Sequence, residues 1–287
     1  MRARRLSSTL NSGSLHQGRC VTGNRVNQES SQSVSPDMQS PGNASPDALS
    51  GEVVILMYHH CAELPPNAAL RGVYVTPRQF AWQMDWLQRH DVQFCTFADL
   101  ESTGASGRCR VIVTFDDGVR DVYEYAFPLL AERHIPAVVF PVVGDIGRSG
   151  VVWAENKDKS PQVLLSESQI RMMDAGGIEF GSHLWEHRKA TRLSPDELRH
   201  QLVRSRDQLA QITGRQILSI AYPYGDHSPE VVAETARAGY RYAVTTEEGS
   251  NRGVPLLELR RYAIKGVSFF HPLRFIRTMR RVLLAHA

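Results

Sequence analysis

Two adjacent carboxylates, Asp116 and Asp117, directly follow the apolar, strand-like run 111–115, and Gly118 comes next. Neighbouring side chains of a strand point to opposite faces, so both carboxylates reach one site only if the strand breaks there, as a glycine permits. A helix cap beside a solvated aspartate is the alternative for this pair taken alone. The pair is a candidate for acid–base or metal chemistry at a strand end.

Two histidines, His183 and His187, follow a second strand-like run, 178–182, with three residues between them. This spacing favours two imidazoles on one face of a helix. Two neutral imidazoles and one carboxylate make a three-ligand set for zinc or a similar divalent ion and leave positions open for water and substrate, as a hydrolase requires. Because the chain contains 11 histidines, a chance pair at this spacing is the alternative.

Two more strand ends carry polar groups. The run 218–220 leads to the sequence Tyr-Pro-Tyr-Gly at 222–225, whose proline and glycine fix a rigid turn. Such a turn can aim a backbone N–H into a site, although an ordinary turn is the alternative. The run 53–58 ends at His59 and His60, which taken alone would more often be structural. Four strand ends that all supply such residues are hard to explain as separate accidents.

The elements that position these residues alternate between strand-like and helix-like segments. Strands are predicted over 53–58, 92–97, 110–115, 136–142, 178–182, 216–221, 240–246 and 257–264. Helices are predicted over 76–89, 119–133, 166–175, 194–213 and 228–239, and from 272 onward. This alternation predicts an α/β fold with a parallel sheet, open or closed as a barrel, and both forms place chemistry at the carboxyl ends of the strands. The long loop 143–161 is expected to be functional.

Composition excludes several classes of protein. Lys and Arg number 33 against 30 Asp and Glu, and a net charge of +3 is too small to make nucleic acid the main partner. The four cysteines have no paired spacing, so neither a metal cluster nor a disulfide framework is expected. No apolar run approaches the about 20 residues of a membrane-spanning helix. The first fifty residues contain no aromatic side chain and no apolar run typical of a secretory signal, which predicts a disordered tail.

Three of these segments together resemble a known family. Residues 114–118, 182–187 and 222–225 are similar to the first three motifs of the polysaccharide deacetylases, the NodB-homology domain of carbohydrate esterase family 4. Residues 56–60 and 74–80 are more narrowly similar to the branch that de-N-acetylates poly-β-1,6-N-acetylglucosamine. The resemblance spans roughly residues 52–280 and implies a distorted (β/α) barrel of about seven parallel strands.

The resemblance also implies roles for the residues that match the motifs. Asp117, His183 and His187 would bind a divalent metal, with zinc as the expected ion. Asp116 would be the general base that activates a metal-bound water for attack on the acetamide. Tyr224 would stabilise the oxyanion through its backbone N–H and, with Pro223, would contact the substrate.

The amide nitrogen leaves only when it is protonated, so a general acid is needed as well. The family's usual Leu-x-His motif near the C-terminus has no convincing counterpart, and His271 lies in the wrong context. In the branch named above the acid comes from the end of the first strand, which maps to His59 in preference to His60. The arginine that orients the base maps to Arg261 in preference to Arg260.

The chain also departs from the family pattern. Ala221 stands where an arginine is common before the Pro-Tyr-Gly turn, which is tolerable if Arg261 orients Asp116. The usual tryptophan-bearing fourth motif is not visible around residues 245–249, so the wall of the acetyl pocket has no assigned residue. The last 28 residues carry seven basic and no acidic side chains. They predict either a weak contact with an acidic surface or a solvated face on a helix that packs inward.

These observations predict a tail over residues 1–50 and a deacetylase domain over 51–287. The expected reaction removes N-acetyl groups from a polysaccharide that contains N-acetylglucosamine. The alternatives are a metal-dependent amidohydrolase for another small or lipid-linked C–N substrate, and a non-catalytic glycan-binding domain, which Asp116 and His59 disfavour. The absence of a recognisable signal favours a cytoplasmic location by default, although the resemblance implies an envelope or exported glycan. The oligomeric state stays open.

Overall fold

The computed structural model of the protein describes Leu49 and residues 53–66, 68–102, 108–155, 160–266 and 271–284. The predicted tail over 1–50, Leu49 apart, lies outside the described residues, as does Cys20. The described cysteines are all free thiols. None of the helices in these ranges is long and apolar enough to cross a membrane.

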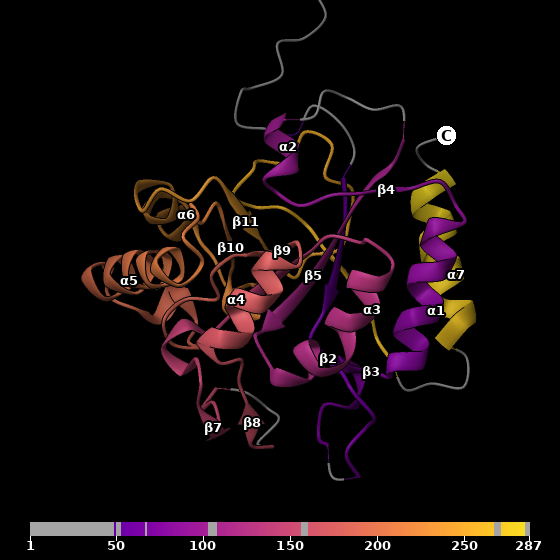
Figure 1. Ribbon diagram of the computed structural model, residues 1–287. Coiled ribbons are helices and arrows are strands. Elements are labelled where there is room, and N and C mark those ends of the chain that lie inside the picture. The colour runs from indigo at the N-terminus through magenta and orange to yellow at the C-terminus, as the bar shows by residue number, and fades with distance from the viewer. Residues whose placement is uncertain are drawn as a thin grey trace, which may run out of the picture. The chain divides into compact units, whose positions relative to one another are not determined.

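A parallel sheet forms the frame that carries the site (Figure 1). Strand β1 (Val53–Tyr58) pairs along its whole length with β5 (Arg110–Asp117). Strand β6 (Ala137–Pro141) pairs with the carboxyl half of β5, and β9 (Ile178–Phe180) pairs with β6. The four strands follow each other in space as they do along the chain, as expected when each is connected to the next by a helix.

The rest of the sheet returns to β1. Strands β10 (Ser219–Ala221) and β11 (Tyr242–Val244) pair with each other, and β12 (Tyr262–Ala263) pairs with β1. Single parallel bridges join these pieces, between Ser182 and Ile220 and between Val244 and Leu259. Within the described residues, seven parallel strands therefore surround a common core, and the predicted distorted (β/α) barrel is confirmed.

Side chains alternate between the inside of the barrel and the helices around it. On β1, Val53 and Ile55 belong to the inner cluster that also contains Ile112 and Val138, whereas Val54, Leu56 and Tyr58 pack toward the helices. On β5 the same alternation places residues 112, 114 and 116 inside. Both strands are buried along their whole length, which explains their continuous apolar sequence.

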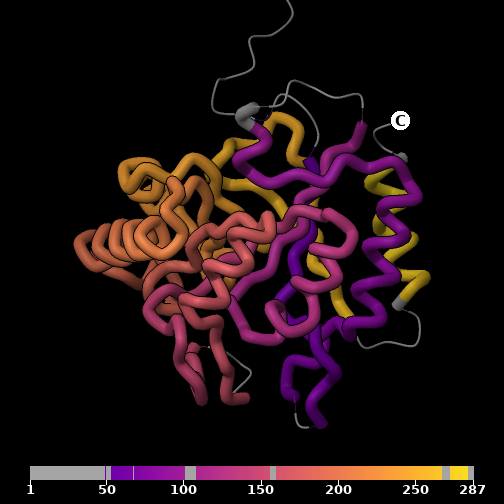
Figure 2. The backbone as a smooth tube through the Cα atoms, in the orientation of Figure 1, coloured from indigo at the N-terminus to yellow at the C-terminus, as the bar shows by residue number. Residues whose placement is uncertain are grey.

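Helices surround the sheet and begin at side-chain caps that the sequence predicts. The N-cap hydroxyls are those of Thr76, Ser166, Ser194 and Ser228. The helices are α1 (Pro77–Gln88), α2 (Asp99–Ser102), α3 (Phe127–Glu132), α4 (Glu167–Ala175), α5 (Pro195–Thr213), α6 (Pro229–Arg237) and α7 (His271–Leu284). The tube in Figure 2 shows α1 and α7 side by side, remote in sequence but adjacent in space.

Short elements complete the described chain. One turn of π-helix, Val122–Ala126, precedes α3 where a continuous helix over 119–133 is predicted. Short strands and 3₁₀ turns lie in the connections: β2 (His60–Cys61), β3 (Tyr74–Val75), β4 (Gln93–Phe94), β7 (Ser149–Val151), β8 (Gln162–Val163), and the turns Arg71–Val73, Val143–Asp145, Ala190–Arg192 and Pro223–Gly225. The strand predicted over 92–97 is reduced to β4, which pairs with the amino half of β5.

Helix α7 packs inward on one face. Phe275 contacts the rings of Trp82 and Trp86 on α1, with ring centroids 5.8 and 5.7 Å apart. Met279 and Val282 are buried beside it, while the arginines at 274, 277, 280 and 281 are exposed. The apolar face is therefore used in the fold, and a contact of the basic face with an acidic surface stays a prediction.

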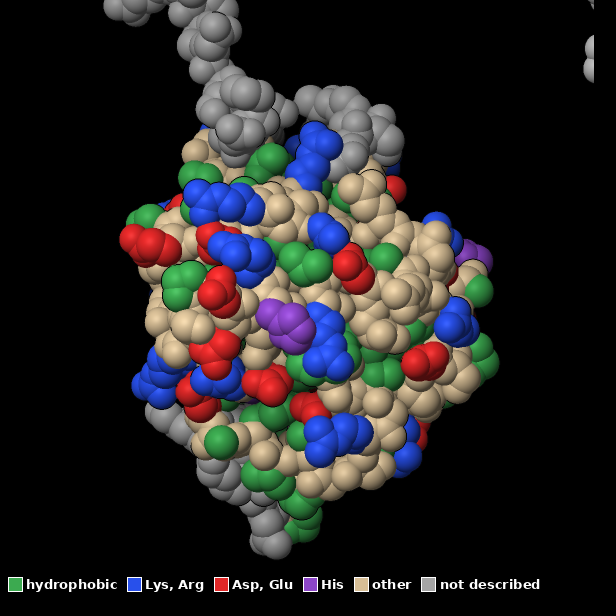
Figure 3. Space-filling view, turned by 90° about the vertical axis from the view of Figure 1, so that its left-hand side faces the viewer, with side chains coloured by type: hydrophobic (Ala, Val, Ile, Leu, Met, Phe, Trp, Pro, Cys, Tyr) green, Lys and Arg blue, Asp and Glu red, His purple; other side chains and the backbone are tan. Residues whose placement is uncertain are grey.

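The face formed by α5 and α6 carries mixed charges (Figure 3). Its basic and acidic side chains are interspersed because they form ion pairs, including Arg199 with Asp196 and Glu234, and Arg237 with Glu234. Such a surface has no extended region of one sign to attract a polyanion.

Candidate active site

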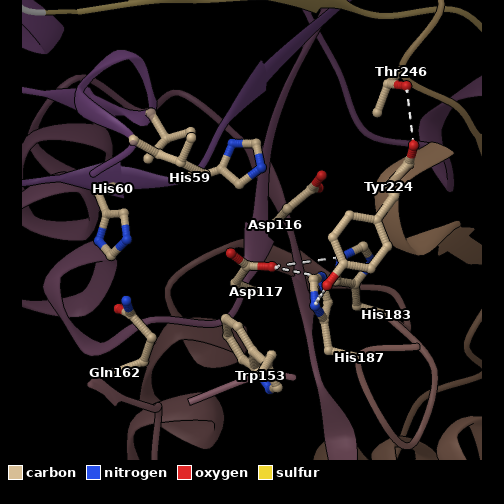
Figure 4. A pocket seen from close by; sticks show the side chains of 12 residues that line it. His59, His60, Asp116, Asp117, Trp153, Gln162, His183, His187, Tyr224 and Thr246 are labelled. Atoms are coloured by element: carbon tan, nitrogen blue, oxygen red, sulfur yellow. Dashed lines mark hydrogen bonds and ion pairs between the residues drawn. The ribbon is translucent and has the colours of Figure 1, made fainter. Parts of the chain in front are cut away.

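The register of β1 and β5 brings two candidate residues together at the carboxyl end of the barrel. Tyr58 is the partner of Phe115, so the next residues along the two strands, His59 and Asp116, are neighbours. Both continue the inward-facing alternation of their strands. Both line the same pocket (Figure 4).

A left-handed backbone at two consecutive residues lets Asp117 reach the same site as Asp116. Asp117 has φ 71° and Gly118 has φ 70°. A Cβ atom on Gly118 would lie 2.5 Å from Cβ of Pro141 on β6, so only glycine fits there. The left-handed backbone therefore begins at Asp117, the last residue of β5, and continues through Gly118, where the sequence predicts the break. Aspartate adopts this conformation more readily than most residues, and here it directs the carboxylate into the site.

The two histidines meet at this end of the barrel, but not on a helix. Residues 183–187 form a loop after β9, and Leu184 has φ 62°, so the prediction of one helical face is wrong. Main-chain bonds fix the loop instead, because Val143 N–H donates to the Leu184 carbonyl. The imidazoles of His183 and His187 lie 5.0 Å apart between centroids.

Asp117, His183 and His187 form a group that fits a divalent cation. Nε2 of His183 and Nε2 of His187 lie 3.5 and 3.4 Å from the same oxygen, Oδ1 of Asp117. Of the buried side-chain nitrogen and oxygen atoms described, this oxygen is the one without a hydrogen bond. Candidate ligand atoms of the three residues lie within 4.8 Å of one another. Two imidazole nitrogens and a carboxylate oxygen match the preferences of zinc and similar ions.

The electrostatics of this group also favour a cation. Burial raises the pKa of Asp117, the charge of His183 lowers it and that of Asp116 raises it, and the net pKa is about 6. Burial, then the neighbouring His183, hold the pKa of His187 well below its usual value, so its ring is neutral. A buried carboxylate without a hydrogen bond and a neutral imidazole are both stabilised by a bound cation.

Asp116 is held by a buried arginine. Nη1 and Nη2 of Arg261 donate to the two carboxylate oxygens at 2.6 and 2.7 Å, and Arg261 is 0% exposed. The guanidinium also donates to the Thr245 carbonyl and to the Thr114 hydroxyl. Burial raises the pKa of Asp116, but the charge and hydrogen bonds of Arg261 outweigh it and hold that pKa well below its usual range. Arg260 instead reaches Glu247 at the surface.

His59 and His60 are adjacent in sequence but held differently. Nδ1 of His60 hydrogen-bonds to Asp121 at 2.6 Å, and its ring stacks on Tyr74 with centroids 4.1 Å apart. The other Asp121 oxygen accepts from Cys61 N–H, which ties the pair into the fold. Burial lowers the pKa of His59, the charge of Asp116 opposes this shift, Arg261 and His60 add to it, and the net pKa is about 4. His59 is therefore neutral at pH 7.

The turn after β10 places Tyr224 over the site. Pro223 fixes the start of the turn, and Tyr224 has φ 62° and ψ 6°. A Cβ atom on Gly225 would lie 2.2 Å from Oγ1 of Thr246, so glycine is required at this approach. The Tyr224 hydroxyl lies 3.0 Å from Nδ1 of His187, and Figure 4 shows the ring above both histidines.

A pocket of about 120 Å³ collects these side chains and several that the sequence did not indicate. Trp153, from the long loop between β7 and β8, lines it and lies 4.6 Å from the His187 ring between centroids. The Trp153 indole N–H donates to Asp145, which is 8% exposed. Other lining residues are Leu70, Val73, Gln162 and Thr246. The loop length indicated a functional segment, but no local pattern singled out Trp153.

Comparison with known families agrees with this geometry. Residues 103–243 match the family model described as polysaccharide deacetylase. The chain belongs to the polysaccharide deacetylase family. The matched range contains Asp116, Asp117, His183, His187 and the 222–225 turn. It contains neither His59 nor Arg261, which join the site through the closure of the barrel.

Known relatives resemble the chain at moderate identity. The chain is 29% identical over 203 residues to YxkH of Bacillus subtilis, covering 68% of this chain and 65% of YxkH. It is 27% identical over 191 residues to a poly-β-1,6-N-acetyl-D-glucosamine N-deacetylase of Staphylococcus aureus, covering 62% and 63%. The chain therefore spans just under two thirds of these relatives. The solved structure of the Streptococcus pyogenes deacetylase PplD with acetate superimposes with TM-score 0.67 at 25% identity, covering 79% and 99%.

Proposed function

We propose that this protein is a metal-dependent hydrolase that removes N-acetyl groups from a polysaccharide containing N-acetylglucosamine. The observation that carries the proposal is the buried Asp117-His183-His187 group, with a second carboxylate, Asp116, held beside it by Arg261. The name of the Staphylococcus aureus relative supports the substrate class. Acetate in the PplD structure is the acid that such a reaction releases.

In this proposal Asp117, His183 and His187 hold a divalent ion, with zinc as the expected one. When bound, such an ion polarises a carbonyl and lowers the pKa of a water at the site toward about 7. His183 suits this role because its Nδ1 donates to the Ala221 carbonyl at 2.7 Å, which leaves Nε2 bare. Ala221, where an arginine is common, thus contributes through its main chain.

Asp116 receives a proton from the attacking water. Both of its oxygens accept hydrogen bonds from Arg261, which orients the carboxylate and keeps it ionised. Because Arg261 also makes Asp116 a weak base, the carboxylate readily gives the proton up again. Arg261 is thus a positioning residue that acts through Asp116.

His59 delivers a proton to the amide nitrogen as that nitrogen leaves. The His59 ring is neutral at pH 7, so it must gain this proton during the reaction. The source of the proton is Asp116, which has taken it from the attacking water. The atoms of the reaction balance, because water supplies one hydroxyl group to the acetyl carbon and one proton to the amine. The backbone N–H of Tyr224 would stabilise the oxyanion, and the buried Pro223 would fix the turn that presents this N–H.

A matched pair of variants tests the proposal. We expect Asp117→Asn to lose both metal and acetate release, and Asp116→Asn to keep the metal but lose at least about 100-fold in kcat. The assay measures acetate from β-1,6- and β-1,4-linked N-acetylglucosamine oligomers, with zinc added to metal-stripped protein. No acetate from wild-type protein that holds zinc stoichiometrically would contradict this substrate class. Wild-type rates in Asp116→Asn would contradict the assignment of the base.

A further inference from the structure

The partner of each metal-facing imidazole decides which of its nitrogens carries the proton. Nδ1 of His183 faces a backbone carbonyl, which only accepts, so its proton is fixed on Nδ1. Nδ1 of His187 faces the Tyr224 hydroxyl at 3.0 Å, and a hydroxyl both donates and accepts. The main chain therefore fixes the tautomer of His183 but leaves that of His187 open.

The two tautomers of His187 suit different states of the site. If the phenol donates to Nδ1, the imidazole proton lies on Nε2, which faces the Asp117 oxygen without a hydrogen bond at 3.4 Å. If Nδ1–H donates to the phenol, Nε2 is bare and can bind a cation. A cation replaces the proton between His187 and Asp117, so it requires the second arrangement.

We propose that the Tyr224 hydroxyl reverses its hydrogen bond to His187 when a divalent ion binds, accepting from Nδ1–H and turning its own proton toward the substrate. The inference rests on the proposed function for the substrate and on the geometry for the reversal. In the ion-bound form the phenol proton no longer points at His187. The ring lines the pocket together with Asp116 and His59, so an acceptor oxygen of the bound sugar is the partner within reach.

The surroundings hold the phenol in place for this role. Tyr224 is half-buried, and the centroid of its ring lies 4.6 Å from that of the His187 ring. Nζ of Lys189 lies 5.9 Å from the centroid of the Tyr224 ring. The Tyr224 carbonyl accepts from the Thr246 hydroxyl, which anchors the residue from the opposite side. Its side chain thus has a role separate from that of its backbone N–H.

The first test compares two tyrosines of the same turn. Tyr224→Phe keeps the ring and the backbone N–H but removes the hydroxyl. Tyr222→Phe is the control, because its hydroxyl donates to the Leu257 carbonyl, away from the metal group. We expect Tyr224→Phe to bind Zn²⁺ 10- to 100-fold more weakly, roughly the cost of losing the partner of a ligating histidine, in titrations against a chelator. The same Zn²⁺ affinity as wild type would overturn the inference.

The second test observes the reversal in unmutated protein. Long-range ¹H–¹⁵N spectra report which nitrogen of His187 is protonated. We expect Nε2–H without metal and Nδ1–H with one equivalent of Zn²⁺. An Nδ1–H tautomer in both states would overturn the reversal.

The third test addresses the donor role at saturating Zn²⁺. We expect Tyr224→Phe to lose about tenfold or more in kcat/KM for acetylated oligomers, and Tyr222→Phe to match wild type. An unchanged kcat/KM in Tyr224→Phe would overturn the donor role. If wild-type protein releases no acetate, the proposed function fails, while Zn²⁺ affinity and the tautomer still decide the reversal.

Discussion

Neighbouring side chains of a strand point to opposite sides, yet beyond the end of β1 both His59 and His60 line the pocket, and they differ in their partners. His59 faces the barrel interior beside Asp116, whereas His60 begins β2 and is bound by Asp121 and Tyr74. Asp116 and Asp117 follow the same rule until the left-handed residue redirects the second carboxylate. Both pairs look alike in sequence, and only the partners of each side chain distinguish them.

The histidine pair gives a prediction at the residue scale. We expect His59→Ala to keep its metal and lose at least about 100-fold in kcat, because the leaving nitrogen lacks its proton donor. His60→Ala should keep kcat within about tenfold but lose about 1–3 kcal/mol of stability, because the Asp121 carboxylate loses a hydrogen-bond partner. Metal content, acetate release and urea unfolding are measured on both. A large kcat loss in His60→Ala with His59→Ala near wild type would reverse the assignment.

The sequence predicted the site residues better than the way they come together. Alternating apolar runs placed Asp116, His183 and Tyr224 at strand ends, because buried parallel strands need such runs. The spacing of the histidines suggested a helix, since periodicity does not show the positive φ of Leu184. Trp153 lies 34 residues before its neighbour His187 and carries no local pattern, so tertiary contact alone reveals it.

The sequence also predicted the starts of helices better than the extent of one strand. The helices with Ser or Thr caps begin where predicted, because a cap is a local interaction between residues three apart. The strand predicted over 257–264 is interrupted: Leu259 bridges β11, and only Tyr262–Ala263 pairs with β1. Arg261 falls between these two pairings and turns its side chain into the barrel. The apolar pattern of the sequence does not show this interruption of the strand, and the interruption places Arg261 beside Asp116.

The break at the end of β5 gives a prediction at the element scale. Gly118→Ala should destabilise the protein by about 3 kcal/mol or more, because a methyl group would overlap Pro141 at a left-handed residue. Gly214→Ala is the control, since Gly214 ends α5 with φ 71° and nothing within 4 Å of the added carbon. It should lose about 1 kcal/mol. Urea unfolding measures the stability of both variants. Equal losses of stability would mean that Pro141 moves aside without a measurable cost.

At the scale of the whole molecule, the two ends of the barrel differ in their buried charge. Glu179 on β9 is half-buried, accepts from Ala98 N–H at 2.9 Å and lines a second pocket, separate from the one that Asp116 lines. Burial raises its pKa, the hydrogen bonds from Ala98 and Thr96 oppose the shift, and Asp99 adds to it. No arginine binds Glu179 as Arg261 binds Asp116 among the described side-chain contacts. Its ionised form is therefore a cost to folding.

This charge predicts how stability depends on pH. A raised pKa in the folded state contributes stability below the unfolded value of about 4.3, and that contribution is lost as pH rises through the folded pKa. Glu179→Gln should therefore be more stable than wild type at pH 7 and equal to it near pH 4. The control is Glu132→Gln, whose side chain is 73% exposed. Urea unfolding across this range measures the difference, and parallel curves for wild type and Glu179→Gln would contradict the prediction.

A buried amide, that of Asn251, supports the closure of the barrel beside the pairing of β12 with β1, and Asn251 is 0% exposed. Its Nδ2 donates to the carbonyls of Val53 and Arg260, and its Oδ1 accepts from Arg260 N–H. These bonds tie the start of β1 to the residue before Arg261, 198 positions apart for the Val53 contact. The position of Arg261, which binds Asp116, thus depends on how the barrel closes.

Replacing this amide tests that dependence. Asn251→Asp should lose more stability than Asn251→Ala at pH 7, because it points a buried charge at two carbonyl oxygens, while the alanine forfeits about 1 kcal/mol per hydrogen bond. The difference in stability between the two variants should become smaller near pH 4, because the introduced carboxylate of the Asn251→Asp variant takes up a proton. Acetate release should fall in both variants with metal content unchanged. The reason is that Arg260, the neighbour of Arg261, loses its hydrogen bonds to Asn251. An Asn251→Asp protein as stable and active as wild type would show that closure does not depend on this amide.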